Sequence, residues 1–179
     1  ADKYGSMRVD SATSLVIMVG HVHLRQANTE FYCDSAVMNR GKRIVEAFGS
    51  VHINDNDSVD VYSRYLLYHM DTKIAYLNEN VRLTDSKSVL ETNELTYDVN
   101  QKIGEYKNGG KVTTGTSVLT SGEGTYYTDL KDVYFKDSVK LVDPQYQLTS
   151  DTLLYNTNTG IATFVALTHI RDSANRKIV

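Results

Sequence analysis

The sequence predicts an all-β protein, an elongated body built from about five repeats of 29 residues, and three observations carry this prediction. Val, Thr, Tyr, Ile and Phe, which favour strands, make up 62 of the 179 residues, with one Pro and no Trp. Apolar and polar residues alternate within short segments, the period of a strand with one buried face. A column of residues recurs at a nearly constant spacing, which is typical of stacked units.

The repeat is anchored on small residues that follow one another at spacings of 30, 29, 29 and 29 residues. These anchors are Cys33, Ser63, Thr92, Ser121 and Ser150. Five positions after each anchor stands a methionine in the first unit and a tyrosine in the other four. These residues are Met38, Tyr68, Tyr97, Tyr126 and Tyr155. The spacing therefore predicts five units that stack around one continuous apolar interior, within a single domain over residues 1–179.

Each unit is expected to contain strands of about ten residues, separated by polar turns. Turn-forming residues stand at 54–57, 70–73, 99–102 and 156–160. Leu90 and Leu95 are apolar but differ by an odd number of positions, so a straight strand would point them to opposite faces. A bulge or bend at the anchor would reconcile them. In the fourth unit, Gly122 and Gly124 predict a strand kink or a wider part of the interior.

Composition excludes several classes of protein. The net charge of -3 excludes a strongly basic nucleic-acid binder, and the single Cys33 excludes an internal disulfide framework or a cysteine-built zinc site. The longest apolar run near the start, 15–19, is too short for a membrane helix. The chain starts at Ala1 without a basic and then apolar leader, so we expect any targeting segment to have been removed.

No motif for catalysis or for a cofactor is present, so we predict that the protein is not an enzyme and needs no cofactor. The acidic segment 55–60 lacks the glycine and the distal glutamate of a calcium loop, which favours a polar hairpin turn. His21, His23 and His52 allow a three-histidine metal site, but a solvated outer ladder is favoured over a metal site. That ladder consists of His23, His52, Arg82, Thr113, Lys140 and His169. The function that it predicts is electrostatic contact with phosphate or other anionic groups.

The segments 32–36, 46–53 and 150–156, together with the ordered units between residues 15 and 170, resemble the OstA/LptA-like family. This resemblance implies a β-jellyroll of two antiparallel sheets that form a V-shaped trough. It further implies a periplasmic protein that carries lipopolysaccharide from the inner to the outer membrane, without covalent chemistry. The acyl chains of lipid A would lie between the sheets. The implied partners are other transport components, joined end to end by strand pairing, with head-to-tail self-association also possible.

The resemblance also assigns interior, lipid-facing positions. They are Val22, Leu24, Val51, Ile53, Leu66, Tyr68, Val81, Leu83, Leu95, Tyr97, Val139, Leu141, Leu153 and Tyr155, with Phe48, Tyr106, Phe135 and Phe164 as second choices. Repeated apolar columns can equally fill the interior with side chains, so a structural or adhesive β-repeat protein with a closed core is the alternative function. A carbohydrate-active enzyme is a distant third, because it would need two carboxylates converging in one cleft.

Overall fold

The computed structural model describes residues 5–10, 12–55, 59–85, 87–165, 167–172, 174 and 176–177. Across these residues the chain forms fifteen β-strands and no helix, which confirms the all-β prediction. The strands are β1 Ser6–Asp10, β2 Leu15–Gln26, β3 Thr29–Asn39, β4 Ile44–Asp55, β5 Val59–His69, β6 Ile74–Thr84, β7 Ser88–Asp98, β8 Ile103–Tyr106, β9 Gly110–Thr114, β10 Ser117–Ser121, β11 Glu123–Tyr127, β12 Asp132–Val142, β13 Tyr146–Asn156, β14 Ala162–Phe164 and β15 Thr168–Asp172.

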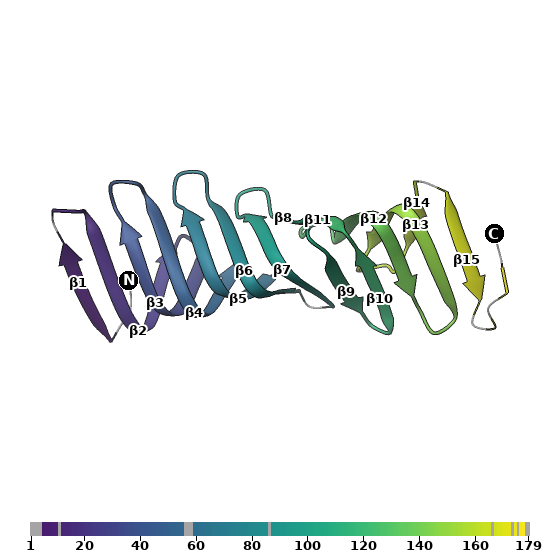
Figure 1. Cartoon of the computed structure of the whole chain (residues 1–179), viewed down its shortest axis with the longest axis horizontal. Helices are drawn as coiled ribbons and strands as arrows, with labels where there is room; N and C mark the ends of the chain where they lie inside the picture. Colours follow the sequence, from purple (N-terminus) through teal and green to yellow (C-terminus); the bar gives the residue numbers. More distant parts are fainter. Residues whose placement is uncertain are drawn as a thin grey trace.

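The strands stack along the long axis of the molecule, and the two ends of the chain lie near its opposite ends (Figure 1). The predicted turns at 70–73 and 99–102 separate β5 from β6 and β7 from β8. Asn56, Asp57 and Ser58, which belong to the predicted polar turn after Asp55, lie outside the described residues.

Strand pairing is antiparallel throughout and follows chain order from β1 to β8. β7 pairs with both β8 and β9, while β12 pairs with both β10 and β11, so that these six strands close a ring. The pairing joins all the described strands into one sheet. The expected division into two sheets is therefore not visible in the pairing, and the number of repeat units stays a prediction.

The long strands bend at β-bulges, as predicted from the odd spacing of the apolar columns. Between β4 and β5, Phe48 pairs with Tyr65 and Val51 pairs with Ser63, so Gly49 and Ser50 together oppose one residue. Gly49 and Ser50 have φ values of 66° and 44°, a left-handed backbone that bends the strand. Similar register shifts interrupt the pairing of β6 with β7 and of β12 with β13.

The hydroxyl anchors of the repeat lie at these bends. Ser63, Ser121 and Ser150 each donate a side-chain hydrogen bond to the backbone carbonyl two residues ahead, at 3.0, 2.7 and 2.9 Å. A bulge interrupts the regular ladder of backbone hydrogen bonds, so a hydroxyl beside it can satisfy a carbonyl that would otherwise need a partner. This is the physical reason for a recurring Ser or Thr at this position, whereas Cys33 is buried there.

A single cluster of buried apolar residues runs from Val16 in β2 to Tyr155 in β13. All fourteen predicted interior residues belong to it, and none is more than 9% exposed. Among the second choices, Tyr106 and Phe135 are buried, whereas Phe48 is 40% and Phe164 45% exposed. The prediction for Phe48 was wrong because its neighbour Ala47 takes the buried position, pairing with Leu66.

Candidate functional site

The interior contains a row of buried tyrosines that alternate with small residues across neighbouring strands. Ala75 lies between Tyr68 and Tyr97 in the strand register. Gly104 lies between Tyr97 and Tyr126. A small side chain between two rings leaves space for both. Val45 and Met38 continue the row beyond Tyr68 toward the amino-terminal end of the molecule, so Met38 stands where the later strands have tyrosine.

Three of these tyrosines reach across the core to a strand that is not their neighbour. Tyr68 Oη donates to Gln26 Oε1 at 2.8 Å, and Tyr97 Oη donates to Asp55 Oδ2 at 3.1 Å. Tyr126 Oη donates to Asp85 Oδ2. Gln26 and Asp55 end β2 and β4, and Asp85 follows β6 directly. We call each of these cross-core hydrogen bonds a clasp, because it ties together two strand ends that lie on either side of the interior.

The Asp55 clasp is charged and buried. Asp55 is 2% exposed, accepts a hydrogen bond from Thr29 Oγ1 at 3.1 Å, and forms an ion pair with Lys102. Burial raises the pKa of Tyr97 above its ordinary value, and the Asp55 charge adds to this, so the phenol stays protonated and donates. Breaking a buried ion pair by removing one partner costs about 3 to 5 kcal/mol, so this clasp holds its strand ends firmly.

The Asp85 clasp is also charged. Asp85 accepts hydrogen bonds from the backbone N–H groups of Lys87 and Ser88, both at 2.8 Å, and lies 3.3 Å from Lys131 Nζ. Burial alone would raise the pKa of Asp85, but the hydrogen bonds from Tyr126, Lys87 and Ser88 and the charge of Lys131 outweigh it, and the pKa is lowered. Asp85 is therefore held as a carboxylate.

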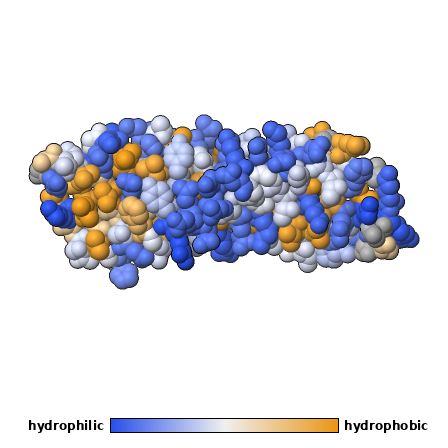
Figure 2. All heavy atoms as spheres, in the orientation of Figure 1, coloured by the Kyte–Doolittle hydropathy of each residue, from blue (hydrophilic) through white to orange (hydrophobic). Residues whose placement is uncertain are grey.

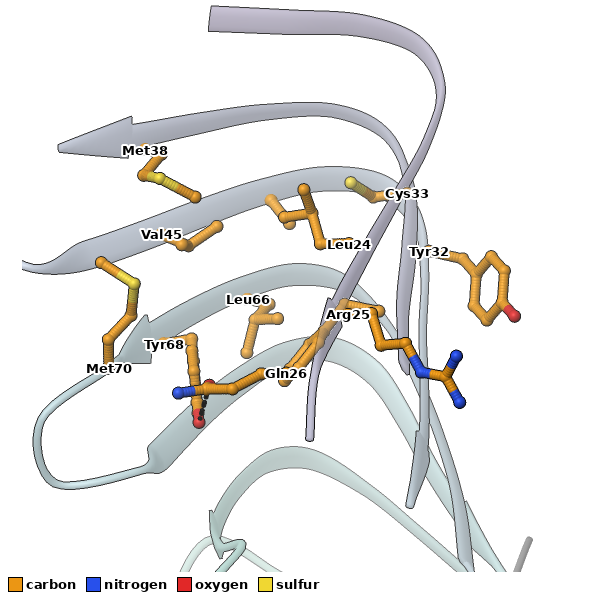
Figure 3. A pocket seen from close by; sticks show the side chains of 12 residues that line it. Leu24, Arg25, Gln26, Tyr32, Cys33, Met38, Val45, Leu66, Tyr68 and Met70 are labelled. Carbon is orange, nitrogen blue, oxygen red and sulfur yellow. Dashed lines mark hydrogen bonds between the residues drawn. The ribbon is translucent and has the colours of Figure 1, made fainter. Parts of the chain in front are cut away.

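The Gln26 clasp is neutral, and it borders an apolar cavity in the amino-terminal region. Figure 3 shows Gln26 and Tyr68 joined beside this cavity, with Met38 and Met70 on another side of it. The cavity has a volume of about 190 Å³. It is lined by Leu24, Arg25, Gln26, Phe31, Tyr32, Cys33, Met38, Val45, Ala47, Leu66, Tyr68 and Met70. Burial raises the pKa of the Cys33 thiol to about 11, so this side chain behaves as a small apolar group.

In the middle of the molecule the interior is filled instead. The Tyr106 ring lies against Gly124 and Gly110, where an added Cβ would come within 2.4 Å of it. Tyr106 Oη is 2.7 Å from Ser121 Oγ. Gly122 separates β10 from β11, which agrees with the predicted kink. The alternative of a wider interior at Gly124 was wrong, because the absent side chain makes room for the Tyr106 ring.

The clasp carboxylates and their lysines were missed by the sequence reasoning. Gln26, Asp55 and Asp85 recur at spacings of 29 and 30 residues, and Lys102 and Lys131 are 29 apart. The signal in the sequence that could have revealed them is that these polar residues recur with the same period as the apolar columns. The pairing itself joins residues about forty positions apart, and it follows only from the bent path of the strands.

The predicted outer ladder is a stack of rings on the face opposite the interior. His23 stacks on Tyr32 at 4.4 Å and His52 stacks on Tyr62 at 4.4 Å, measured between ring centroids. His52 Nε2 lies 2.6 Å from Asp60 Oδ1. Tyrosine therefore separates the two imidazoles, and in the described part of the chain no group of three or more His, Cys, Asp or Glu residues is arranged to hold a metal ion.

The row differs from the prediction in its members. Beyond Arg82 the register leads to Glu91 and then to Lys111, so Thr113 does not belong to the row. Glu91 and Lys111 form an ion pair at 2.5 Å. One carboxylate, Glu91, therefore lies between the cations Arg82 and Lys111, and beyond them Thr120 and Thr149 lie on either side of Lys140.

Apolar residues are exposed mainly toward the two ends, while the middle of the same face is mostly hydrophilic (Figure 2). At the amino-terminal end, Met7 and Val9 on β1 are 47% and 49% exposed. At the other end, Ile161 and Leu167 are 62% and 80% exposed. Within the described ranges, no helix is long and apolar enough to cross a membrane.

Comparison with known proteins places the chain. A model of the family described as OstA-like protein matches residues 3–151. No curated protein sequence matches the chain. A similar solved structure is that of LptH, the LptA homologous periplasmic component of the conserved lipopolysaccharide transport device from Pseudomonas aeruginosa. The two chains are 14% identical with a TM-score of 0.55, and the match covers 63% of this chain and 86% of LptH.

At this level of identity the likeness to LptH concerns the fold, and it supports the predicted β-jellyroll. The family model spans far more than half of the sequence, from the first strand to the middle of β13. The chain therefore belongs to the OstA-like family.

Proposed function

We propose that this protein is a periplasmic module that binds lipopolysaccharide and passes it along a protein bridge toward the outer membrane. The acyl chains of lipid A occupy the interior, and the two halves of the bent strands act as the walls of a V-shaped trough built from about five units. Neighbouring transport components, or further copies of this chain, join the two ends by strand pairing. No covalent step is involved, so the protein is not an enzyme.

The observation that carries the proposal is the single apolar cluster that runs from Val16 to Tyr155. Burial of one methylene is worth about 0.8 kcal/mol, so about a dozen methylenes supply on the order of 10 kcal/mol. An exposed ion pair gives only about 0 to 1 kcal/mol. An interior of this kind therefore favours an acyl chain over a charged ligand, and surface charges serve to orient the headgroup.

The edge strands support the proposed bridge. In the described part of the chain β1 pairs only with β2, and β15 pairs with β13 and forms one isolated bridge between Arg171 and Lys177. An edge strand presents unpaired N–H and C=O groups to a further strand. Met7 and Val9 are about half exposed on β1, so pairing with a partner strand would also cover apolar surface.

One observation favours the second candidate, a structural β-repeat protein with a closed core. The predicted lipid-facing residues are at most 9% exposed, and the charged clasps at Asp55 and Asp85 close the middle of the interior. Under the transport proposal these side chains move apart when the lipid enters. Under the structural alternative they stay packed.

Photocrosslinking to purified lipopolysaccharide separates the two functions. A photoreactive residue replaces Leu66 or Leu153 in the interior, and a matched variant carries it at Lys140 on the outer face. Crosslinks at the interior sites without crosslinks at Lys140 are expected. Folded protein that crosslinks at neither interior site would refute lipid transport and favour the structural alternative.

A further inference from the structure

The cavity at the amino-terminal end differs from the rest of the core in the side chains that surround it. Ala47 occupies the row that Leu77 fills one hairpin later, since both pair with Leu66. Met38 occupies the tyrosine row and, like Met70, is only partly buried. Methionine is unbranched and flexible, so it can move aside at little cost. This part of the interior can therefore admit an apolar group without displacing a rigid ring.

The size of the cavity limits what it holds before anything moves. Its volume of about 190 Å³ is below the roughly 300 to 1,000 Å³ of sites that enclose a drug-sized ligand. It has room for the end of one acyl chain and not for a whole lipid. Its lining is mainly aliphatic and aromatic, which suits a saturated hydrocarbon.

The clasp beside this cavity is also the one without charges. Tyr68 donates to an amide oxygen of Gln26, whereas Tyr97 and Tyr126 donate to carboxylates that are also paired with lysines. Hydrogen bonds to ionised groups are roughly twice as strong as bonds between neutral groups. The strand ends beside the cavity therefore separate more readily than those in the middle of the molecule.

We propose that an acyl chain first enters the interior at the amino-terminal cavity beneath the neutral Gln26–Tyr68 clasp, while the charged clasps of Asp55 and Asp85 keep the middle closed at that stage. This inference rests on the proposed function and assigns its entry site. Gln26 sets the position of entry, because it stands where the later strands place a carboxylate.

A single substitution tests this role. Lys73 stands at the last position of its turn with a φ of 58°, as do Lys102 and Lys131 with φ values of 58° and 60°. Gln26→Asp therefore offers Lys73 the partner that Asp55 offers Lys102, and converts the neutral clasp into a charged one. Gln147→Asp, an identical change at an exposed residue of β13, is the matched control.

The readout is the rate at which N-ethylmaleimide alkylates Cys33, the only cysteine of the chain and a residue of the cavity wall. Because this thiol is buried and its pKa is raised to about 11, alkylation is slow and is followed over hours at mildly alkaline pH, so that its rate reports the opening of the cavity. Purified lipopolysaccharide at about ten times its dissociation constant should slow this reaction about tenfold in the wild type and in Gln147→Asp, because only the unliganded fraction reacts. Gln26→Asp should lose most of this protection while remaining folded, as judged by its thermal transition.

A second readout does not depend on thiol chemistry. A photoreactive residue at Met70, beside the cavity, should crosslink at lower lipopolysaccharide concentration than one at Leu141 in β12. Equal crosslinking at both sites, or full protection of Cys33 in Gln26→Asp, would overturn the entry site. Co-sedimentation with lipopolysaccharide distinguishes failure of this inference from failure of the proposed function. A wild type that binds without protecting Cys33 refutes this inference alone, whereas a wild type that does not bind refutes the proposed function as well.

Discussion

The amino-terminal region and the middle of the molecule share one strand architecture but differ in what fills it. Around β2 to β5 the interior has Ala47 and Met38 in its rows, a neutral clasp and a cavity. From β6 to β12 the corresponding rows hold Leu77, Tyr106 and Phe135, and the clasps are charged. The side chains in these rows therefore determine whether the bent strands surround a cavity or a filled core.

The largest expected effect comes from breaking a charged clasp. Asp55→Ala removes the acceptor of Tyr97 and Thr29 and leaves Lys102 without its buried partner. We expect a loss of about 3 to 5 kcal/mol in the free energy of unfolding, measured by urea denaturation. Asp60→Ala, which removes the partner of His52 on the outer face, is the control and should cost no more than about 1 kcal/mol. Equal losses for the two variants would mean that the buried clasp stabilises the protein no more than the pair on the outer face does.

Filling the glycine beneath Tyr106 should have the next largest effect. In Gly124→Ala the new Cβ would lie 2.4 Å from the Tyr106 ring, so the ring or the strand must shift, at a cost of about 1 to 3 kcal/mol. At Gly104 an added Cβ would meet Leu83, Leu95 and Tyr97 at 3.5 to 3.7 Å, which is ordinary contact. Gly104→Ala should therefore change stability by less than about 1 kcal/mol. If neither Gly124→Ala nor Gly104→Ala lowered the melting temperature in thermal denaturation, the Tyr106 ring would not be packed tightly against Gly124.

The two regions should also differ in their response to pH. The folded pKa of Asp85 is lowered, so its contribution to stability is present above its unfolded pKa of about 3.9 and is lost as the pH falls through the lower folded value. Each unit of pH in that window removes at most about 1.4 kcal/mol for this group. Asp85→Asn should flatten the acid branch of a plot of unfolding free energy against pH. Gln26, which does not titrate, gives the amino-terminal clasp no such branch.

In both regions the contribution to the free energy of unfolding should fall at alkaline pH. Burial raises the pKa of Tyr68 to about 12, with the charge of Asp55 adding to it, and burial raises the pKa of Tyr106 to about 12. Above pH 10 or so the unfolded chain releases these protons first, so stability falls as the pH rises toward 12. Tyr68→Phe should reduce this slope by about the contribution of one group. An unchanged slope would show that the Tyr68 phenol is not buried in solution.

The fold could be predicted because strand alternation and the repeat are local patterns. The incorrect predictions concern positions where the strand is bulged or interrupted, so that spacing in the sequence no longer gives the face on which a side chain lies. Phe48 and Ala47 are adjacent, and a shift of one position moves a side chain to the opposite face. The bulge at Gly49 and Ser50 breaks the correspondence between columns on its two sides. Thr113 was misplaced for a related reason, because the strand is interrupted at 107–109 and Lys111 takes the outer position.

The cavity was beyond the reach of the sequence because it depends on the sum of several side-chain volumes around one point. Taken alone, Ala36 and Ala47 are ordinary buried residues and Met38 is an ordinary partly buried one. Only the register, which places Ala36 beside Ala47 and Met38 beside Val45, shows that the small and flexible side chains meet at one place. The clasps depend likewise on strand ends that the sequence separates by about forty residues.

The smallest expected effect concerns the cavity itself, and it tests whether side-chain volume alone explains the difference between the regions. Ala47→Leu gives the amino-terminal row the residue that stands at Leu77, and the added atoms have the cavity to occupy. Stability should therefore change by less than about 1.5 kcal/mol, in contrast to the loss of about 1 to 3 kcal/mol expected for Ala75→Leu, which is fully buried between Tyr68 and Tyr97. Urea denaturation compares the two variants. If Ala47→Leu were as costly as Ala75→Leu, the amino-terminal cavity would be no more accommodating than the filled core, and the difference in side-chain volume could not account for it.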